Sequence, residues 1–316
     1  MLDFAGRVAI VTGAGRGMGR SHARMLASRG CKVVVNDLKS NTLNPAQDVV
    51  AEIMATGGVA VYDNNSVVGG CEKIVKTAIE EYGRIDILVC NAGIMSSEWL
   101  ADASTEDWYA VFDTHFRGTV DLCREAWPYL IESGSGRIIT VSSSGMLGNA
   151  GLTSYGSAKG AIFSFTRSLA LEGERHGITA NIILPSARSR MTDTIPDEAI
   201  LATIEKYFQP EHVSSLVTWL AHQDTHVNNE AFQVSGGRAG RILVGAMPTV
   251  RNQESSPEIW AQRAEELLAD GPMKPLRTTG EMFFDELADA DPEIREALAG
   301  AAGSVGHKRT SGREAP

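Results

Sequence analysis

Short apolar runs alternate with amphipathic stretches along most of the chain. The apolar runs predict strands at 8–11, 32–36, 59–61, 85–90, 137–141, 178–184 and 231–234. The stretches between them predict helices at 18–28, 46–56, 71–82, 105–129, 154–174 and 210–222. Unbroken apolar runs suit strands that are buried on both faces of a parallel sheet. The alternation therefore predicts an α/β fold, a doubly wound parallel sheet of the Rossmann type built from right-handed βαβ units.

The pattern changes after residue 245. Ser256 and Pro257 form a helix start, with a serine cap and a proline in the first turn. Helices are predicted at 259–269, 281–289 and 292–299. We therefore expect the sheet domain over residues 1–245, a C-terminal helical extension over 246–302 and a flexible tail over 303–316.

Composition and charge narrow the class of protein. Hydrophobic residues make up 43% of the chain and charged residues 22%, which is enough for a packed core. The net charge of −10 argues against nucleic acid or an anionic membrane as partner, because both require a basic face. No leader and no run long enough to span a bilayer is visible, so a cytoplasmic protein is expected. The four cysteines lack zinc-site spacing, so we expect free thiols and no metal.

A glycine-rich loop follows the first predicted strand and opens the first predicted helix. It reads TGAGRGMG and contains Gly13, Arg16, Gly17, Met18 and Gly19. Glycines allow backbone amides to approach a pyrophosphate closely, and a helix N-terminus attracts its negative charge. The order strand, loop, helix therefore predicts a dinucleotide site.

An acidic residue, Asp37, lies at the end of the second predicted strand. A carboxylate there accepts hydrogen bonds from the ribose hydroxyls and repels a 2′-phosphate. This favours NAD over NADP. Arg16 in the loop points weakly the other way, because a cation pairs with a phosphate, but Asp37 is expected at the 2′ position itself.

A tyrosine and a lysine lie one helical turn apart, at Tyr155 and Lys159. A free tyrosine has a pKa of about 10, and a neighbouring ammonium together with a nicotinamide cation is expected to lower it. Tyr155 is then suited to exchange a proton with a substrate oxygen, and Lys159 to hold the nicotinamide ribose. Ser142, at the end of the fifth predicted strand, is expected to orient that oxygen. The three residues predict oxidoreductase chemistry between a secondary alcohol and a ketone.

Over residues 5 to 240 these motifs resemble the short-chain dehydrogenase/reductase superfamily. The resemblance rests on TGxxxGxG, Asn91-Ala92-Gly93, Ser142 and YxxxK. It implies a homodimer or homotetramer that assembles through two long helices and acts on a small-molecule substrate. It also implies further cofactor contacts at Asn91, Ala92, Gly93, Thr192 and Asn65, with Asp63 as the competitor of Asn65 for the adenine.

Two positions depart from the family pattern. Strand six ends in Pro185-Ser186 where the family has Pro-Gly, and His115 stands where it has a catalytic asparagine. His115 with its neighbours, the strings at 35–38 and 189–192 and the extension resemble one subgroup. It comprises the (3R)-hydroxyacyl-CoA dehydrogenase units of peroxisomal multifunctional enzymes of type two and their bacterial single-domain relatives. In that subgroup the extension helps to line a partner subunit's active site. Residues 19–23 are instead similar to NAD-retaining dehydrogenases of terpenoid alcohols.

Three functions stay open at this point. A (3R)-hydroxyacyl-CoA dehydrogenase is favoured, with Arg188 and Arg190 suited to the coenzyme A phosphates. The alternative is a hydroxysteroid or terpenoid alcohol dehydrogenase, whose apolar pocket would be formed by Met95, Trp99, Leu147, Leu152 and Met191. The third is an NAD-binding sensor without turnover, and the intact Ser142, Tyr155 and Lys159 argue against it.

Overall fold

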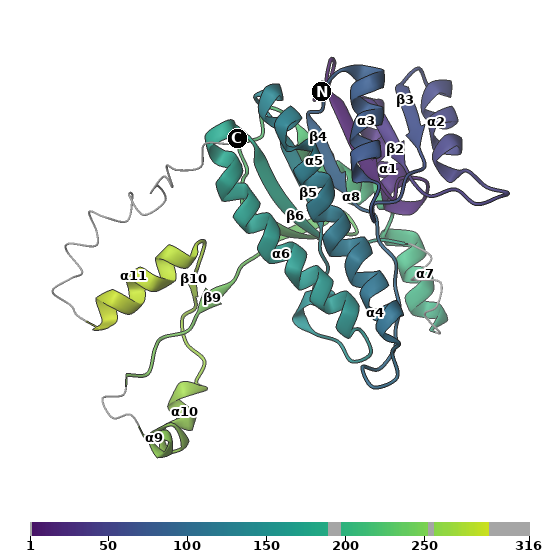
Figure 1. The fold of residues 1–316 in the computed structure, drawn as a ribbon. Coiled ribbons are helices and arrows are strands. Elements are labelled where there is room, and N and C mark those ends of the chain that lie inside the picture. Colours follow the sequence, from purple (N-terminus) through teal and green to yellow (C-terminus); the bar gives the residue numbers. More distant parts are fainter. Residues whose placement is uncertain (1, 189–196, 252–255, 291–316) are drawn as a thin grey trace, which may run out of the picture. The chain divides into compact units, whose positions relative to one another are not determined.

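A single sheet of eight strands organises the first part of the chain (Figure 1). The computed structural model describes residues 2–188, 197–251 and 256–290. The strand order is β3-β2-β1-β4-β5-β6-β7-β8, parallel throughout except that β8 runs antiparallel to β7. This order confirms the predicted doubly wound α/β fold. The strands are β1 (Val8–Thr12), β2 (Lys32–Asn36), β3 (Val59–Asp63), β4 (Ile87–Cys90), β5 (Arg137–Val141), β6 (Thr179–Ser186), β7 (Ala231–Ser235) and β8 (Arg238–Ile242).

Helices cover both faces of the sheet. One face packs against α1 (Gly17–Ala27), α2 (Pro45–Ala55) and α8 (Pro210–Ala221). The other packs against α3 (Cys71–Tyr82), α5 (Gly118–Ser133) and α6 (Thr153–Gly173). Strands covered on both faces have no solvent-facing side, which explains why their sequences are continuous apolar runs.

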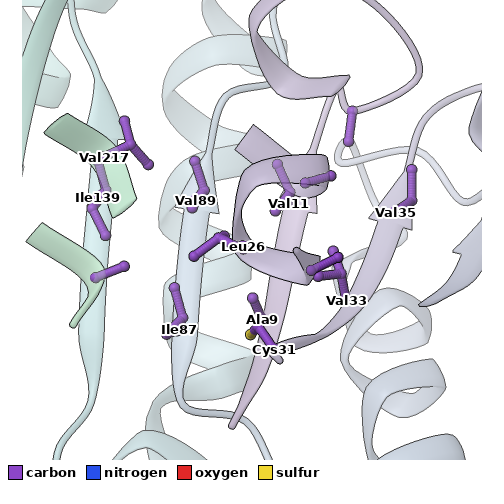
Figure 2. Packing of buried hydrophobic residues seen from close by; sticks show 14 of the residues in the cluster. Ala9, Val11, Leu26, Cys31, Val33, Val35, Ile87, Val89, Ile139 and Val217 are labelled. Atoms are coloured by element: carbon purple, nitrogen blue, oxygen red, sulfur yellow. The ribbon is translucent and has the colours of Figure 1, made fainter. Parts of the chain in front are cut away.

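Alternate residues of each strand contribute to two separate cores. In β1, Ala9 and Val11 face the α1 side, whereas Val8 and Ile10 face the α3 side. Figure 2 shows Leu26 of α1 among the side chains of β1, β2 and β4. Burial of each such side chain contributes roughly 1.5–3 kcal/mol. These two cores fix the carboxyl ends of the strands at one edge of the sheet.

The long helix predicted at 105–129 is interrupted in the structure. It consists of α4 (Thr105–Phe112), a π-helical turn η1 (Asp113–Arg117) and α5, which continues to Ser133. Such turns insert one extra residue into a helix and often occur at functional sites. The turn carries His115.

Strand β8 and helix α7 have no counterpart in the prediction. Strand β8 contains small and polar residues, mostly exposed, because it lies at the sheet edge and pairs only with β7. Its apolar signal is therefore weak. Helix α7 (Glu198–Tyr207) begins after Asp197, whose side chain caps it by accepting from the Ile200 N–H.

The residues after Ile242 form a second compact unit. It contains an antiparallel pair, β9 (Gly245–Ala246) and β10 (Lys274–Pro275), and the helices α9 (Pro257–Gln262), α10 (Ala264–Leu267) and α11 (Thr279–Ala290). Ser256 caps α9. The helix expected at 259–269 is interrupted at Arg263. The predicted helix at 292–299 and the tail at 303–316 lie outside the described residues.

The part of the chain that the structure describes contains neither a candidate membrane span nor a candidate metal site. None of its helices combines the length and apolar character that a membrane span requires. It also contains no group of three or more His, Cys, Asp or Glu side chains arranged to hold a metal ion. The four cysteines are buried free thiols: Cys31, Cys71, Cys90 and Cys123.

Candidate active site

The glycine loop connects β1 to α1 in a conformation that requires its glycines. Gly13 and Gly17 have φ angles of +60° and +51°, the left-handed region that favours glycine. A Cβ on Gly19 would lie 2.2 Å from the Gly13 carbonyl oxygen. The backbone thus forms a tight cradle at the N-terminus of α1, a geometry suited to a pyrophosphate.

The segment after β4 is tied to this loop. Asn91 Nδ2 donates to the carbonyl oxygens of Thr12 at 2.9 Å and Gly13 at 3.1 Å. The N–H groups of Asn91 and Ala92 both donate to Thr12 Oγ1, each at 3.1 Å. The structure therefore brings Asn91, Ala92 and the glycine loop together at one edge of the sheet.

Asp37 lies beside the glycine loop just after β2. Its Oδ2 accepts from the Gly15 N–H and its Oδ1 from the Leu38 N–H, both at 2.8 Å. The side chain of Arg16 at the N-terminus of α1 is exposed. A carboxylate held next to a glycine cradle fits the ribose and pyrophosphate of a nicotinamide adenine dinucleotide.

Tyr155 and Lys159 lie in the first part of α6, and both are buried. Lys159 Nζ is 5.5 Å from the centroid of the Tyr155 ring and donates to the Val141 carbonyl oxygen at 2.6 Å. Burial lowers the pKa of Lys159 to about 7. The ammonium is therefore held by the end of β5 rather than by the tyrosine hydroxyl.

Adjacent serines after β5 face opposite directions. Ser142, the predicted partner of the substrate oxygen, is 1% exposed, and its hydroxyl donates to the Lys159 carbonyl oxygen at 2.8 Å. Ser143 instead lines the cavity beside Tyr155 and forms a side-chain hydrogen bond with it. The Gly145 N–H donates to Ser143 Oγ at 3.1 Å and fixes that oxygen. The structure thus brings Ser143, not Ser142, to the tyrosine.

The acidity of Tyr155 differs from the expectation. Burial raises the pKa of Tyr155, and the hydrogen bond from Ser143 opposes that rise. Lys159 does not add to the lowering by Ser143, and its side chain donates to the Val141 carbonyl oxygen. In this state the tyrosine is a neutral phenol, ready to donate a proton.

His115 lies against both Tyr155 and Gly93. The His115 and Tyr155 rings meet edge to face with centroids 5.3 Å apart, and a Cβ on Gly93 would lie 2.1 Å from His115 Cε1. His115 Nε2 is 2.7 Å from the Ile94 carbonyl oxygen, so this nitrogen carries the proton. Burial, with Lys159 nearby, lowers the pKa of His115 to about 3. The imidazole is therefore neutral, and its buried Nδ1 has no hydrogen-bond partner.

A cavity of about 830 Å³ opens beside these groups. Its described lining is mainly apolar and contains no lysine or arginine. The residues are Met18, Met95, Ser143, Ser144, Gly145, Asn149, Leu152, Tyr155, Pro185, Ser186, Ala187, Asp197, Ala199, Ile200, Thr203, Ile204 and Phe208. Six of these seventeen residues belong to β6 and α7, which the motifs did not indicate as a cavity wall.

The other predicted pocket residues are distributed differently. Met95 and Leu152 line the cavity, whereas Trp99 and Leu147 are 66% and 78% exposed and are absent from its described wall. Arg188 forms an ion pair with Glu205 at 2.9 Å. Arg190, Met191 and Thr192 lie outside the described residues.

Comparison with known proteins identifies the family. Residues 7–198 match the family model for short chain dehydrogenases. Peroxisomal multifunctional enzyme type 2 of Mus musculus is 37% identical over 98% of this chain, which spans only 45% of that protein's length. A 3-oxoacyl-[acyl-carrier-protein] reductase of Synechocystis is 39% identical over 75% of this chain and 98% of its own.

A solved structure agrees with these matches. A short chain dehydrogenase from Mycobacterium avium has a TM-score of 0.76 and 36% identity, over 86% of this chain and 98% of its own. The glycine cradle, the neighbouring carboxylate and the YxxxK helix lie in the matched part of the sequence. The chain therefore belongs to the short-chain dehydrogenase family, oxidoreductases that act on a CH–OH group with a nicotinamide cofactor.

Proposed function

We propose that this protein uses NAD to oxidise the secondary alcohol of a (3R)-hydroxyacyl thioester, with coenzyme A as the carrier. The observation that carries the proposal is the placement of Tyr155 and Ser143 on the wall of a large, mainly apolar cavity. An apolar cavity of this size accommodates an acyl chain, and the hydroxyls of Tyr155 and Ser143 are both suited to bond one substrate oxygen within it. The name of the Synechocystis relative, a 3-oxoacyl-[acyl-carrier-protein] reductase, agrees with an acyl thioester as substrate.

The preference for NAD rests on Asp37. Its carboxylate is held by the Gly15 N–H at 2.8 Å, so a negative charge is fixed beside the glycine cradle. Two ribose hydroxyls donate favourably to such a carboxylate, whereas a 2′-phosphate is repelled by it. The side chain of Arg16, which favours a phosphate, is exposed to solvent. NAD is therefore the proposed cofactor.

The protein's own groups handle the proton. A bound nicotinamide supplies the hydride acceptor. Tyr155 Oη, once ionised, takes the proton of the substrate hydroxyl, and Ser143 Oγ turns its hydrogen bond from the tyrosine to the substrate oxygen. When bound, the oxidised nicotinamide would also supply a positive charge beside Tyr155, and this charge would favour the ionised tyrosine. We assign Lys159 to the nicotinamide ribose, with Val141 O as its anchor.

His115 is proposed as a positioning residue. Its neutral ring is fixed by the bond to Ile94 O and packs against Gly93 and the edge of Tyr155. A protonated imidazole would add a second cation near Lys159, which the buried site disfavours. The ring thus fixes the position of Tyr155 relative to the segment after β4.

A comparison of substrates tests the proposal. We expect NADH formation with a (3R)-hydroxyacyl-CoA, and kcat/KM about tenfold or more lower for the same acyl group on a truncated thioester. Equal kcat/KM for both thioesters would remove coenzyme A from the proposal. Turnover of sterols or terpenoid alcohols, with none on either thioester, would overturn it.

The second candidate is a hydroxysteroid or terpenoid alcohol dehydrogenase. It is favoured by the described cavity wall, which contains no lysine or arginine for coenzyme A phosphates. Arg188 is also engaged by Glu205 rather than directed at that wall. Activity on free alcohols in the same comparison would support this candidate.

We also propose a homodimer or homotetramer. The observation that supports it is a hollow beside α4 that is lined by Val68 and Tyr109, whose side chains are 39% and 55% exposed. Sedimentation equilibrium of the purified protein distinguishes these states from a monomer, which would refute the proposal.

A further inference from the structure

Helix α6 begins only two residues before Tyr155, at Thr153. Leu152, at its N-cap position, provides no side-chain hydrogen bond, so the first turn lacks the cap that Ser, Thr, Asp or Asn supplies. A first turn without a cap frays more readily, because its N–H groups have no partner within the helix. The position of Tyr155 therefore depends on what else holds this turn.

Trp108 of α4 holds the first turn of α6 from outside. Helix α4 packs against α6 (Figure 1), and the Nε1–H group of Trp108 donates to Thr153 Oγ1 at 3.1 Å. An indole has one polar group, which only donates, so this bond has a single direction. The Trp108 ring stacks on Phe112, one turn further along α4, with centroids 5.8 Å apart and 14° between the planes. The donor is thus fixed on its own helix.

The same helical run contacts α6 at two further points. The ring of His115, in the π-helical turn, meets the Tyr155 ring edge to face with centroids 5.3 Å apart. Phe116 meets Phe165 of α6 in the same manner at 6.1 Å. Ring contacts of this kind allow some sliding, whereas a hydrogen bond specifies one partner atom. Trp108 therefore provides the directional contact of this set.

We propose that Trp108 is a positioning residue, which holds the first turn of α6 through Thr153 and so keeps the Tyr155 hydroxyl beside Ser143. Thr153 is two residues before Tyr155, so a shift of this turn moves the tyrosine with it. The inference rests on the proposed function, because it concerns the tyrosine that exchanges the proton. It does not depend on which alcohol the enzyme oxidises.

The contact has a consequence for the acidity of Tyr155. Burial raises the pKa of Tyr155, and the hydrogen bond with Ser143 opposes that rise. Release of the turn from Trp108 lets the hydroxyl leave Ser143, so the pKa should rise further. The titratable side chains that face the ring are His115 and Lys159, whose Nζ lies 5.5 Å from the ring centroid. A role of Trp108 in stability alone would leave the pH dependence of kcat unchanged.

The pH dependence of kcat, measured with an alcohol that the wild type oxidises, tests the proposal. Trp108→Phe keeps an aromatic ring without the donor, and Thr153→Val keeps the branched shape without the acceptor. Each should lower kcat about tenfold, because misplacement of a catalytic group slows the chemical step. Each should also move the rising limb of kcat to higher pH, with the dissociation constant for NAD as in wild type. Thr153→Ser, which retains the hydroxyl, should restore both.

Trp219→Phe is the matched control, because Trp219 is 40% exposed on α8, which covers the opposite face of the sheet. It should have the kcat and pH dependence of wild type. Wild-type kinetics in Thr153→Val, or an equal loss in Thr153→Ser, would overturn the proposal.

Amide hydrogen exchange at residues 156–159 requires no substrate. It should be faster in Thr153→Val than in wild type, because the first turn opens more often. Equal exchange rates would also overturn the proposal. If the wild type oxidises no alcohol, the proposed function fails, and the exchange rates alone decide whether Trp108 holds the turn.

Discussion

At the residue scale, the end of β5 shows that a difference of one position in the sequence decides which serine lies next to Tyr155. Ser142 and Ser143 are consecutive, so their side chains point to opposite sides of an extended chain. Counting back from Tyr155 selected Ser142, yet its hydroxyl bonds the backbone of α6 at Lys159. The direction of each side chain depends on where β5 ends, which spacing alone does not define. Three consecutive serines were the only sequence signal that a neighbour could replace Ser142.

Replacement of each serine separates the two roles. Ser143→Ala is expected to lower kcat by roughly 10²-fold, because it removes a hydrogen-bond donor at the substrate oxygen. Ser142→Ala, the matched control, is expected to keep kcat within a few fold. Steady-state kinetics with the best substrate measures both. Equal losses, or a greater loss for Ser142→Ala, would contradict the assignment.

The burial of Lys159 in the site also affects the free energy of unfolding. Its pKa is about 7 in the folded protein and about 10.4 in an unfolded chain. Between these values the unfolded chain binds more protons, so this group makes the folded state more stable as pH rises. Below pH 7 Lys159 is protonated in both the folded and the unfolded protein. The buried ammonium then lowers the free energy of unfolding by its full amount, about 1.4 kcal/mol for each unit by which the two pKa values differ.

Lys159→Met should therefore abolish activity but raise the free energy of unfolding relative to wild type at pH 6. The gain should decrease steadily as pH rises towards 10, which urea denaturation at several pH values measures. Lys76→Met is the control, because Lys76 is exposed and pairs only with Glu80. If the difference in the free energy of unfolding between Lys159→Met and wild type did not vary with pH, burial would not lower the pKa of Lys159.

At the scale of elements, the glycine loop and α1 act as one unit. Gly19→Ala places a methyl group 2.2 Å from Gly13 O, so the cradle must open. We expect the dissociation constant for NAD to rise at least tenfold, measured by calorimetry. Gly160→Ala in α6 is the control, since its Cβ meets nothing within 4 Å. There a gain in stability of about 0.5–1 kcal/mol is expected, and NAD binding as poor as for Gly19→Ala would contradict the cradle.

The π-helical turn and the segment after β4 fit together through His115 and Gly93. Gly93→Ala is expected to lower both the melting temperature and kcat, because its methyl group collides with the imidazole. His115→Ala removes that collision, so the double variant should be more stable than the sum of the single losses predicts. Thermal melts of the four proteins provide this cycle. Strict additivity would show that the two residues do not contact.

Elements with a buried apolar face were predictable from the sequence. The strand at 32–36 and the helix at 71–82 agree with β2 and α3 at both ends. The π-helical turn at 113–117 was not predictable, because such turns are rare and no residue type marks them. Strand β8 was missed because exposure on an edge removes the apolar pattern.

At the scale of the whole molecule, parallel topology explains why distant motifs meet. Carboxyl ends of parallel strands lie at one edge, so loops after β1, β2, β4 and β5 converge there. The sequence therefore predicted a dinucleotide site and its acid/base pair. The cavity wall contributed by β6 and α7 was not predictable, because its residues bear no motif and depend on packing across the fold.

The rate of NADH formation with a (3R)-hydroxyacyl-CoA is the most direct test of the proposed NAD-dependent oxidation. We expect turnover with NAD, at least tenfold less with NADP because of Asp37, and none with the (3S) enantiomer. Tyr155→Phe should bind NAD as wild type does and form no NADH above background. Preference for NADP, or no turnover of the thioester by a protein that binds NAD, would show that the protein does not have the proposed function.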